Sequence, residues 1–214
     1  MVYESDYTPL RPGGETLTRR LLSLGGEMRN RCVLDLGCGT GETAWLLARE
    51  YGAVVTGVDL SAVRIEKCRQ KYPCAAFVSA DARNLPFPNG SFDVLVSECC
   101  FSVFQDPKKA FQEASRVLVP GGKLLLSDLW QRGGVSGGSG MVRSLYSRDA
   151  WLDMVARAGF TLTDFVDERS ALTEMYGQMI LDLGLEGAQQ QMGLCLRREE
   201  IKSVSYMLLA GEKK

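Results

Sequence analysis

The sequence predicts an α/β protein in which a parallel sheet is covered by helices on both faces. Strand-like and helix-like segments alternate through the first two-thirds of the 214 residues, which is typical of strand–helix–strand units. The strand-like segments are continuous apolar runs, as expected of strands buried on both faces. The composition, with 45% hydrophobic and 24% charged residues, is that of a globular chain long enough to bury a core.

The first elements are identified by their apolar runs and periodicities. Ser61 is a good N-cap, so a helix is expected to begin there. After this helix, residues 75–78 form the third expected strand. The elements before Ser61 are, in order, a helix with an apolar face at Leu17, Leu21 and Leu24, a strand over residues 31–36, a helix with a face at Ala44, Leu47, Ala48 and Tyr51, and a strand over residues 53–58.

Turn signals divide the middle of the chain. Residues 84–90 are rich in Pro, Asn and Gly, which is typical of a loop, and residues 92–97 form the fourth expected strand. Asp106-Pro107 indicates an N-cap followed by proline at the first helical position. The segment 120–122, Pro-Gly-Gly, is expected to end that helix, and residues 123–127 form the fifth strand.

The last third begins with a glycine-rich segment, residues 133–140, which indicates a mobile loop. A helix is expected from near Ser147 to Ala158, closed by Gly159. A strand over residues 160–167 follows it. Two helical apolar stripes and a final strand complete the chain; the stripes begin at Leu172 and Leu185, and the strand covers residues 204–210.

The composition excludes several classes of function. Histidine is absent, which excludes Ser-His-Asp, Cys-His and histidine–metal chemistry. The seven cysteines are odd in number and have no C-x-x-C spacing, so neither a disulfide framework nor a metal site is expected. The net charge of -1 gives no basic footprint for nucleic acid. With no membrane-length apolar run and no signal-peptide pattern, we expect free thiols, no membrane partner and a cytoplasmic location.

The strongest functional signal is the segment from Val33 to Gly41, with the sequence VLDLGCGTG. A buried strand runs directly into the glycines, and a helix begins at once. Glycine allows the tight turn and lets a ligand approach the backbone, and the helix N-terminus offers free N–H groups and a positive dipole. This strand–turn–helix context predicts a nucleotide-like site.

Two acidic residues follow the next two strands. Asp59 ends the second strand, where a carboxylate can accept hydrogen bonds from both hydroxyls of a ribose. Asp81, followed by Ala82, lies just past the third strand. These residues and the glycine motif are expected to meet at the carboxyl edge of the sheet.

With these motifs in order, the sequence resembles the class I S-adenosylmethionine-dependent methyltransferases, of the small methyltransferase-11 type. The family's glycine motif is present over residues 35–41, and the segments beginning at Phe92 and at Arg116 are also typical. The resemblance covers residues 30–165 and the last strand. It implies a Rossmann-like, doubly wound, mostly parallel seven-stranded sheet with an antiparallel last strand. It also implies methyl transfer from S-adenosylmethionine, with S-adenosylhomocysteine as product.

The resemblance implies roles for individual residues. Asp35 would bond the methionyl amino group, Asp59 would hold the ribose diol, and Asp81 would accept the adenine amino group. Glu98 would contact the methionine end or the substrate, and it is the candidate catalytic residue. The other candidate cofactor-binding residues are Gly37, Cys38, Gly39, Gly41, Leu60 and Ala82, together with Arg11, whose guanidinium suits the cofactor carboxylate.

The sequence leaves alternatives open. Relatives often carry a histidine shortly after the fourth strand, where this chain has none, so Glu98 and Asp128 are the candidate bases. Cys99 and Cys100 could bind an arsenite-type or thiol substrate, or they could be small buried hydrophobes. A non-catalytic S-adenosylmethionine-binding module and a nicotinamide-dependent oxidoreductase are rival interpretations, although nicotinamide sites prefer G-x-G-x-x-G.

We expect one domain over residues 1–214 that acts on a small molecule rather than on nucleic acid. We expect the variable segments of the chain to determine which molecule accepts the methyl group. Met175, Met179 and Met192 could line an apolar pocket or pack in the core. The expected parts are an N-terminal lid and helix (1–30), a cofactor-binding core (31–130), a glycine-rich mobile loop (131–147) and a helical insertion before the last strand (168–203).

Overall fold

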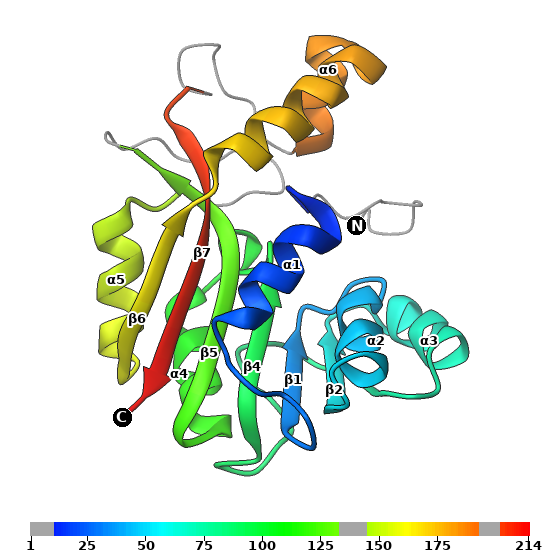
Figure 1. Ribbon diagram of the computed structural model, residues 1–214, viewed down its shortest axis with the longest axis vertical. Coiled ribbons are helices and arrows are strands. Elements are labelled where there is room, and N and C mark those ends of the chain that lie inside the picture. The colour runs from blue at the N-terminus through cyan, green and yellow to red at the C-terminus, as the bar shows by residue number, and fades with distance from the viewer. Residues whose placement is uncertain (1–10, 133–144, 193–201) are drawn as a thin grey trace.

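The computed structural model describes residues 11–132, 145–192 and 202–214. Its centre is a seven-stranded sheet with the strand order β3-β2-β1-β4-β5-β7-β6 (Figure 1). β7 is antiparallel to its neighbours β5 and β6, and the other pairings are parallel, which confirms the predicted topology. The strands are β1 (Cys32–Leu36), β2 (Val54–Asp59), β3 (Ala76–Ser79), β4 (Phe92–Glu98), β5 (Leu118–Gln131), β6 (Phe160–Asp167) and β7 (Val204–Lys213).

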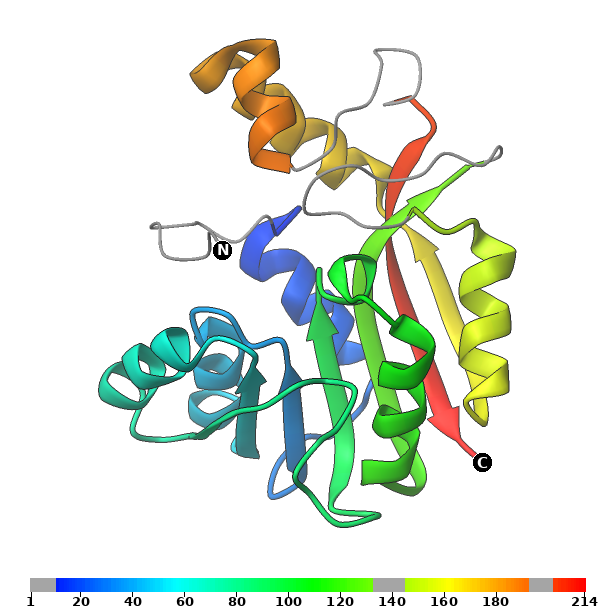
Figure 2. The same cartoon turned by 180° about the vertical axis from the view of Figure 1, so that it is seen from behind.

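Helices cover both faces of the sheet (Figures 1 and 2). The core under one face contains Val33 and Ile65, and the core under the other contains Leu34 and Trp151. Consecutive residues of β1 therefore point to opposite apolar layers, as a strand buried on both faces requires. The first face carries α1 (Gly14–Ser23), α2 (Glu42–Arg49) and α3 (Ala62–Lys71), and the second carries α4 (Pro107–Val117) and α5 (Arg148–Arg157).

Side-chain caps fix the starts of three helices. Ser61 Oγ accepts a hydrogen bond from Arg64 N at 3.3 Å, and Asp106 Oδ1 accepts one from Lys109 N at 3.1 Å. Ser147 caps α5 in the same way. The predicted N-caps at Ser61 and Asp106 are therefore confirmed, and each cap is worth about 1 kcal/mol.

Several boundaries differ from the sequence-based prediction, among them the start of β5 and the end of α2, and the structure contains one additional element. β5 begins at Leu118, so the Pro-Gly-Gly segment lies within the strand as an irregularity of its pairing with β4. α2 ends at Arg49, so Tyr51 lies beyond it. A short 3₁₀ helix, η1 (Phe101–Val103), follows β4 and was not predicted, because three residues are too few to show a periodicity.

α6 (Arg169–Met192) projects beyond the carboxyl edge of the sheet (Figure 1). It consists of two helices joined at Gly184, where φ is 72° and ψ is 171°, which explains the two predicted stripes. None of the described helices has the length and apolar character needed to cross a bilayer. The predicted glycine-rich loop over residues 133–140, the N-terminal part of the predicted lid and Cys195 lie outside the described residues.

Candidate functional site

The parallel strands bring acidic side chains to one edge of the sheet. Asp35 lies in β1, Asp59 and Glu98 end β2 and β4, and Asp128 lies near the end of β5. Two adjoining cavities of about 590 and about 640 Å³ open at this edge. The predicted meeting of the motifs at the carboxyl edge is therefore confirmed.

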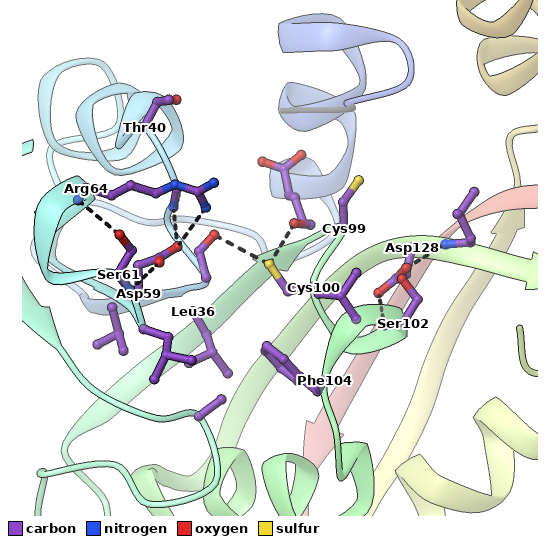
Figure 3. Close-up of a pocket in the computed structure, with 18 of the residues that line it drawn as sticks. Leu36, Thr40, Asp59, Ser61, Arg64, Cys99, Cys100, Ser102, Phe104 and Asp128 are labelled. Carbon is purple, nitrogen blue, oxygen red and sulfur yellow. Dashed lines mark hydrogen bonds and ion pairs between the residues drawn. The ribbon is translucent and has the colours of Figure 1, made fainter. Parts of the chain in front are cut away.

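The two cavities differ in their walls. The first cavity is lined by Asp59, Leu60 and Asp81 and is drawn in Figure 3. The second cavity is lined by Arg11 and Asp35. Residues that line both cavities are Gly37, Gly39, Thr40, Glu98 and Cys99, so the glycine turn and the end of β4 lie where the cavities meet.

The glycine turn packs closely against the segment that follows β4. Gly37 has a φ of 79°, and a Cβ there would lie 2.1 Å from Cys100 Sγ. The N–H groups of Gly37 and Cys38 donate to Val58 O, at 2.7 and 2.9 Å, and Gly39 N–H donates to Asp59 Oδ2 at 3.1 Å. These three N–H groups already have protein partners, so the expectation that they are free donors for a ligand is wrong. The space left by Gly37 is taken by Cys100, whereas a Cβ at Gly39 would meet nothing closer than 4.0 Å.

Two candidates of the glycine motif face α3 rather than the first cavity. The buried Cys38 thiol contacts the thiol of Cys68, although Cys38 also borders the second cavity. Gly41 is the N-cap of α2, and a Cβ there would lie 3.0 Å from Cys68 Sγ and 3.1 Å from the ring of Tyr72. Gly41 lines neither cavity, so its absent side chain serves the packing of α2 against α3.

Asp59 is held rigidly at the end of β2. Its Oδ2 accepts from Gly39 N, its Oδ1 accepts from Ser61 N at 2.9 Å, and Arg64 Nη1 lies 3.9 Å from Oδ2 (Figure 3). Leu60, the next residue, is 74% exposed and lines the first cavity. A fixed carboxylate beside an exposed apolar surface suits a ribose diol and an aromatic base.

Asp81 lines the first cavity but already has a partner. The guanidinium of Arg83 donates from Nε to Oδ1 at 3.0 Å and from Nη2 to Oδ2 at 2.6 Å. This hydrogen bonding holds the pKa of Asp81 below its usual value. A base amino group would therefore add to an existing ion pair, with Ala82 beside it in the cavity wall.

A cluster of polar and charged side chains surrounds the second cavity. Glu98 Oε1 accepts from Thr43 Oγ1 and Glu98 Oε2 accepts from Thr18 Oγ1, both at 2.7 Å. Arg11 Nη1 donates to Thr43 Oγ1 at 3.2 Å, and Arg11 Nε lies 3.9 Å from Glu98 Oε2. Asp35 Oδ2 and Arg11 Nε are buried and have no hydrogen-bond partner in the protein.

Asp35 is only 2% exposed, and its environment opposes ionisation. Burial raises the pKa of Asp35 to about 8, and the negative charge of Glu98 contributes to this increase while Arg11 opposes it. The carboxyl group is therefore mostly protonated at neutral pH until a cation comes within reach.

Asp128 is buried beneath η1. Its Oδ2 accepts from Ser102 N at 3.0 Å, and its Oδ1 accepts from Leu129 N at 2.7 Å (Figure 3). Burial raises the pKa of Asp128 to about 6, while hydrogen bonds from Ser102 act in the opposite direction. These bonds make Asp128 an anchor for η1.

Cys99 and Cys100 both have protein partners. Cys99 Sγ lies 3.0 Å from Tyr206 Oη, and Cys100 Sγ donates to Glu98 O at 3.1 Å. Desolvation raises the pKa of both thiols above the usual value. Neutral, partnered thiols support the interpretation of small hydrophobes over that of a thiolate pair that binds a metalloid.

Sequence reasoning missed several residues of the site. Thr43 lies two residues past the glycine motif in α2, which is a signal that could have been used. Arg83 likewise lies two residues past Asp81. Thr18 in α1 and Tyr206 in β7 are far away in the sequence, and no local pattern marks them.

Together the cavities fit a nucleoside joined to an amino acid. Asp59 can accept hydrogen bonds from a ribose diol in the first cavity. In the second cavity, the unpartnered Asp35 oxygen suits an ammonium group and the unpartnered Arg11 nitrogen suits a carboxylate. S-adenosylmethionine carries all of these groups, so the residues present fit it.

Comparisons with known proteins agree with this chemistry. A family described as "Methyltransferase domain" matches residues 34–126. Methyltransferase GfsG of Streptomyces halstedii is 28% identical over 98% of this chain and 84% of its own length. O-methyltransferase cnsE of Penicillium expansum is 29% identical over 94% of this chain and 78% of its own length.

A solved structure of geranyl diphosphate methyltransferase in complex with SAM is similar in fold. Its TM-score is 0.79 at 19% identity, and the match covers 93% of this chain and 85% of that one. At this identity the likeness supports a shared fold alone.

Proposed function

This chain belongs to the class I S-adenosylmethionine-dependent methyltransferases, and we propose that it methylates a small-molecule acceptor by in-line displacement. The observation that carries the proposal is a pair of buried atoms without a hydrogen-bond partner in the protein, the carboxyl oxygen Asp35 Oδ2 and the guanidinium nitrogen Arg11 Nε, in a cavity next to Asp59. When bound, S-adenosylmethionine supplies a methyl group activated by a positively charged sulfur. The protein then has to bring the nucleophile, the methyl carbon and the sulfur into line and to exclude water.

Each end of the cofactor has its own binding residues in this proposal. Asp59 holds the ribose diol, while Leu60 provides an apolar surface for the adenine. Asp81 and Ala82 lie at the far rim of the adenine site. These assignments are supported by the lining of the first cavity, which contains all four residues.

At the other end, Asp35 binds the ammonium group and Arg11 binds the carboxylate. Glu98 lies where the two cavities meet, and its oxygens accept from Thr18 and Thr43. We therefore propose that Glu98 removes the proton from a substrate that binds in its protonated form. Glu98 also contacts the cofactor. Asp128 is a poorer candidate, because it is only 1% exposed and its carboxylate is bonded to the backbone of Ser102 and Leu129, whereas Glu98 lines both cavities.

The small-molecule character of the acceptor is supported by the size of the two cavities, about 590 and about 640 Å³. The relatives GfsG and cnsE are named as a methyltransferase and an O-methyltransferase. The six cysteines within the described residues are free thiols, which supports a reducing location such as the cytoplasm.

The test is a transfer assay with methyl-labelled S-adenosylmethionine and a whole-cell extract, whose small molecules and macromolecules are separated after the reaction. We expect label in a low-molecular-weight product and formation of S-adenosylhomocysteine. Asp59→Ala should lose this activity, and Asp153→Ala should keep it, because Asp153 is an exposed residue of α5 paired with Arg157. Binding of S-adenosylhomocysteine without any transfer of label, or transfer only to macromolecules, would contradict the proposal.

A further inference from the structure

The first cavity extends beyond the residues assigned to the cofactor. Part of its lining is formed by Leu129 of β5, Tyr206 of β7 and Leu172 and Met175 of α6, which belong to one apolar cluster together with Cys99. We call these four residues the acceptor lobe. Because the cofactor is assigned to Arg11 and to residues in or just after β1, β2, β3 and β4, the acceptor lobe is left for the methyl acceptor.

The polar groups around the acceptor lobe are bonded within the protein. Tyr206 Oη donates to Ser127 Oγ at 2.8 Å and lies 3.0 Å from Cys99 Sγ. The neighbouring Asp128 carboxylate accepts from Ser102 N and Leu129 N. The four residues of the acceptor lobe, which are all within the described part of the chain, are otherwise apolar, and none of them carries a positive charge. A negatively charged ligand would meet apolar side chains and the charge of Asp128, which is unfavourable.

The first turns of α6 are fixed to the body of the protein. Glu168 N donates to Tyr206 O at 2.7 Å, immediately before α6 begins, and Glu168 is ion-paired with Arg20 of α1. Leu172 is only 6% exposed. The apolar wall is therefore formed before any acceptor binds, while the flexible Met175 side chain can adapt to its shape.

We propose that Leu172 and Met175 determine which acceptor is methylated, and that they select a neutral, apolar molecule. This inference rests on the proposed function, since it assigns the rest of the cavity to S-adenosylmethionine. Phosphate and carboxylate groups are disfavoured in the lobe, because no polar atom of its four residues is free to pair with them and Asp128 repels them. Asp128 attracts an ammonium group, but both of its oxygens already accept hydrogen bonds from N–H groups, so we expect the lost hydration of the ammonium group to outweigh this attraction.

The test uses three probes that share one ring system and differ in charge. The protein is saturated with S-adenosylhomocysteine and titrated calorimetrically with 2-naphthol, 2-naphthyl phosphate and 2-(aminomethyl)naphthalene. We expect 2-naphthol to bind at least about tenfold more tightly than either charged probe. Leu172→Trp and Met175→Trp fill the lobe and should each weaken 2-naphthol binding by at least about tenfold, with little change in S-adenosylhomocysteine affinity.

Leu181→Trp is the matched control, because Leu181 lies on the same helix but is 81% exposed. It should leave all affinities unchanged. Tighter or equal binding of a charged probe, no binding of 2-naphthol, or unchanged 2-naphthol affinity in both lobe variants would overturn the inference. Failure of the wild-type protein to bind S-adenosylhomocysteine would instead overturn the proposed function. Retained S-adenosylhomocysteine binding in the variants also reports that they fold.

Discussion

Asp35 and Arg11 are residues whose buried polar atoms lack a partner in the protein. Leaving such an atom unsatisfied costs about 1–3 kcal/mol, and more when the group is charged. The cost is recovered when a ligand supplies an ammonium group to Asp35 and a carboxylate to Arg11. The free-energy cost of these two unsatisfied atoms in the empty site therefore favours binding of a ligand that carries both an ammonium group and a carboxylate.

This arrangement predicts a pH dependence of cofactor binding. The pKa of Asp35 is raised to about 8 without ligand, and an adjacent ammonium group lowers it in the complex. Binding then releases a proton at pH values below about 8, so affinity rises as pH increases toward 8 and levels off above it. Calorimetric titration with S-adenosylhomocysteine should show an increase of up to about tenfold per pH unit between about pH 6.5 and 8.

Asp35→Asn is the control for this prediction. Asparagine cannot ionise, so the variant should bind at low pH about as well as the wild type and gain no affinity as the pH rises. An equal pH slope in both proteins would contradict the assignment of Asp35.

The role assigned to Asp59 predicts that its substitution lowers the affinity for S-adenosylhomocysteine. Asp59→Ala removes a charge-assisted contact worth about 1.5–3 kcal/mol, so S-adenosylhomocysteine should bind about 10- to 150-fold more weakly. Because Asp59 also holds Gly39 and Ser61, the loss could come from the loop instead. The 2′,3′-dideoxy analogue separates the two causes: it should bind wild type and variant equally, and a loss of the same size with both ligands would refute the diol contact.

At the scale of elements, the turn between β1 and α2 is shaped by the contact of Gly37 with Cys100. Gly37→Ala combines a positive φ with a Cβ 2.1 Å from Cys100 Sγ, and should cost about 2–6 kcal/mol of folding stability. Gly39→Ala meets nothing closer than 4.0 Å and should cost only about 1–3 kcal/mol of backbone strain. Urea unfolding measures both.

Cys100→Ala in the Gly37→Ala background removes the closest contact. It should restore part of the lost stability and leave the cost of the positive φ. Equal losses for the two glycine variants, or no recovery in the double variant, would show that Cys100 does not limit this position.

The elements themselves were largely predictable from local patterns. The continuous apolar runs identified all seven strands, and the caps at Ser61 and Asp106 identified helix starts. The start of β5 was missed because Pro120 and two glycines locally indicate a turn, whereas pairing with β4 keeps the segment in the sheet. The joint at Gly184 was visible only as a break between two stripes, since no local rule fixes the direction of the second helix.

For the molecule as a whole, the sequence could predict the topology and the acidic residues at the strand ends. The parallel part of the sheet and the acidic residues follow from the order of elements along the chain, whereas the antiparallel last strand was implied by the family resemblance. It could not predict the partners that Thr18 and Tyr206 supply, because their positions depend on how α1 and β7 pack. The same limit applies to the acceptor lobe, which combines β5, β7 and α6 and exists only in the folded chain.

The central claim is that the amino-acid end of the cofactor lies between Asp35 and Arg11. The most direct test compares the affinity of S-adenosylhomocysteine with that of 5′-methylthioadenosine, which has the same nucleoside but no amino-acid group. Loss of two charge-assisted contacts should weaken binding by at least about 100-fold in calorimetry. Equal affinity for the two ligands would contradict the account, because the second cavity would then contribute nothing to recognition.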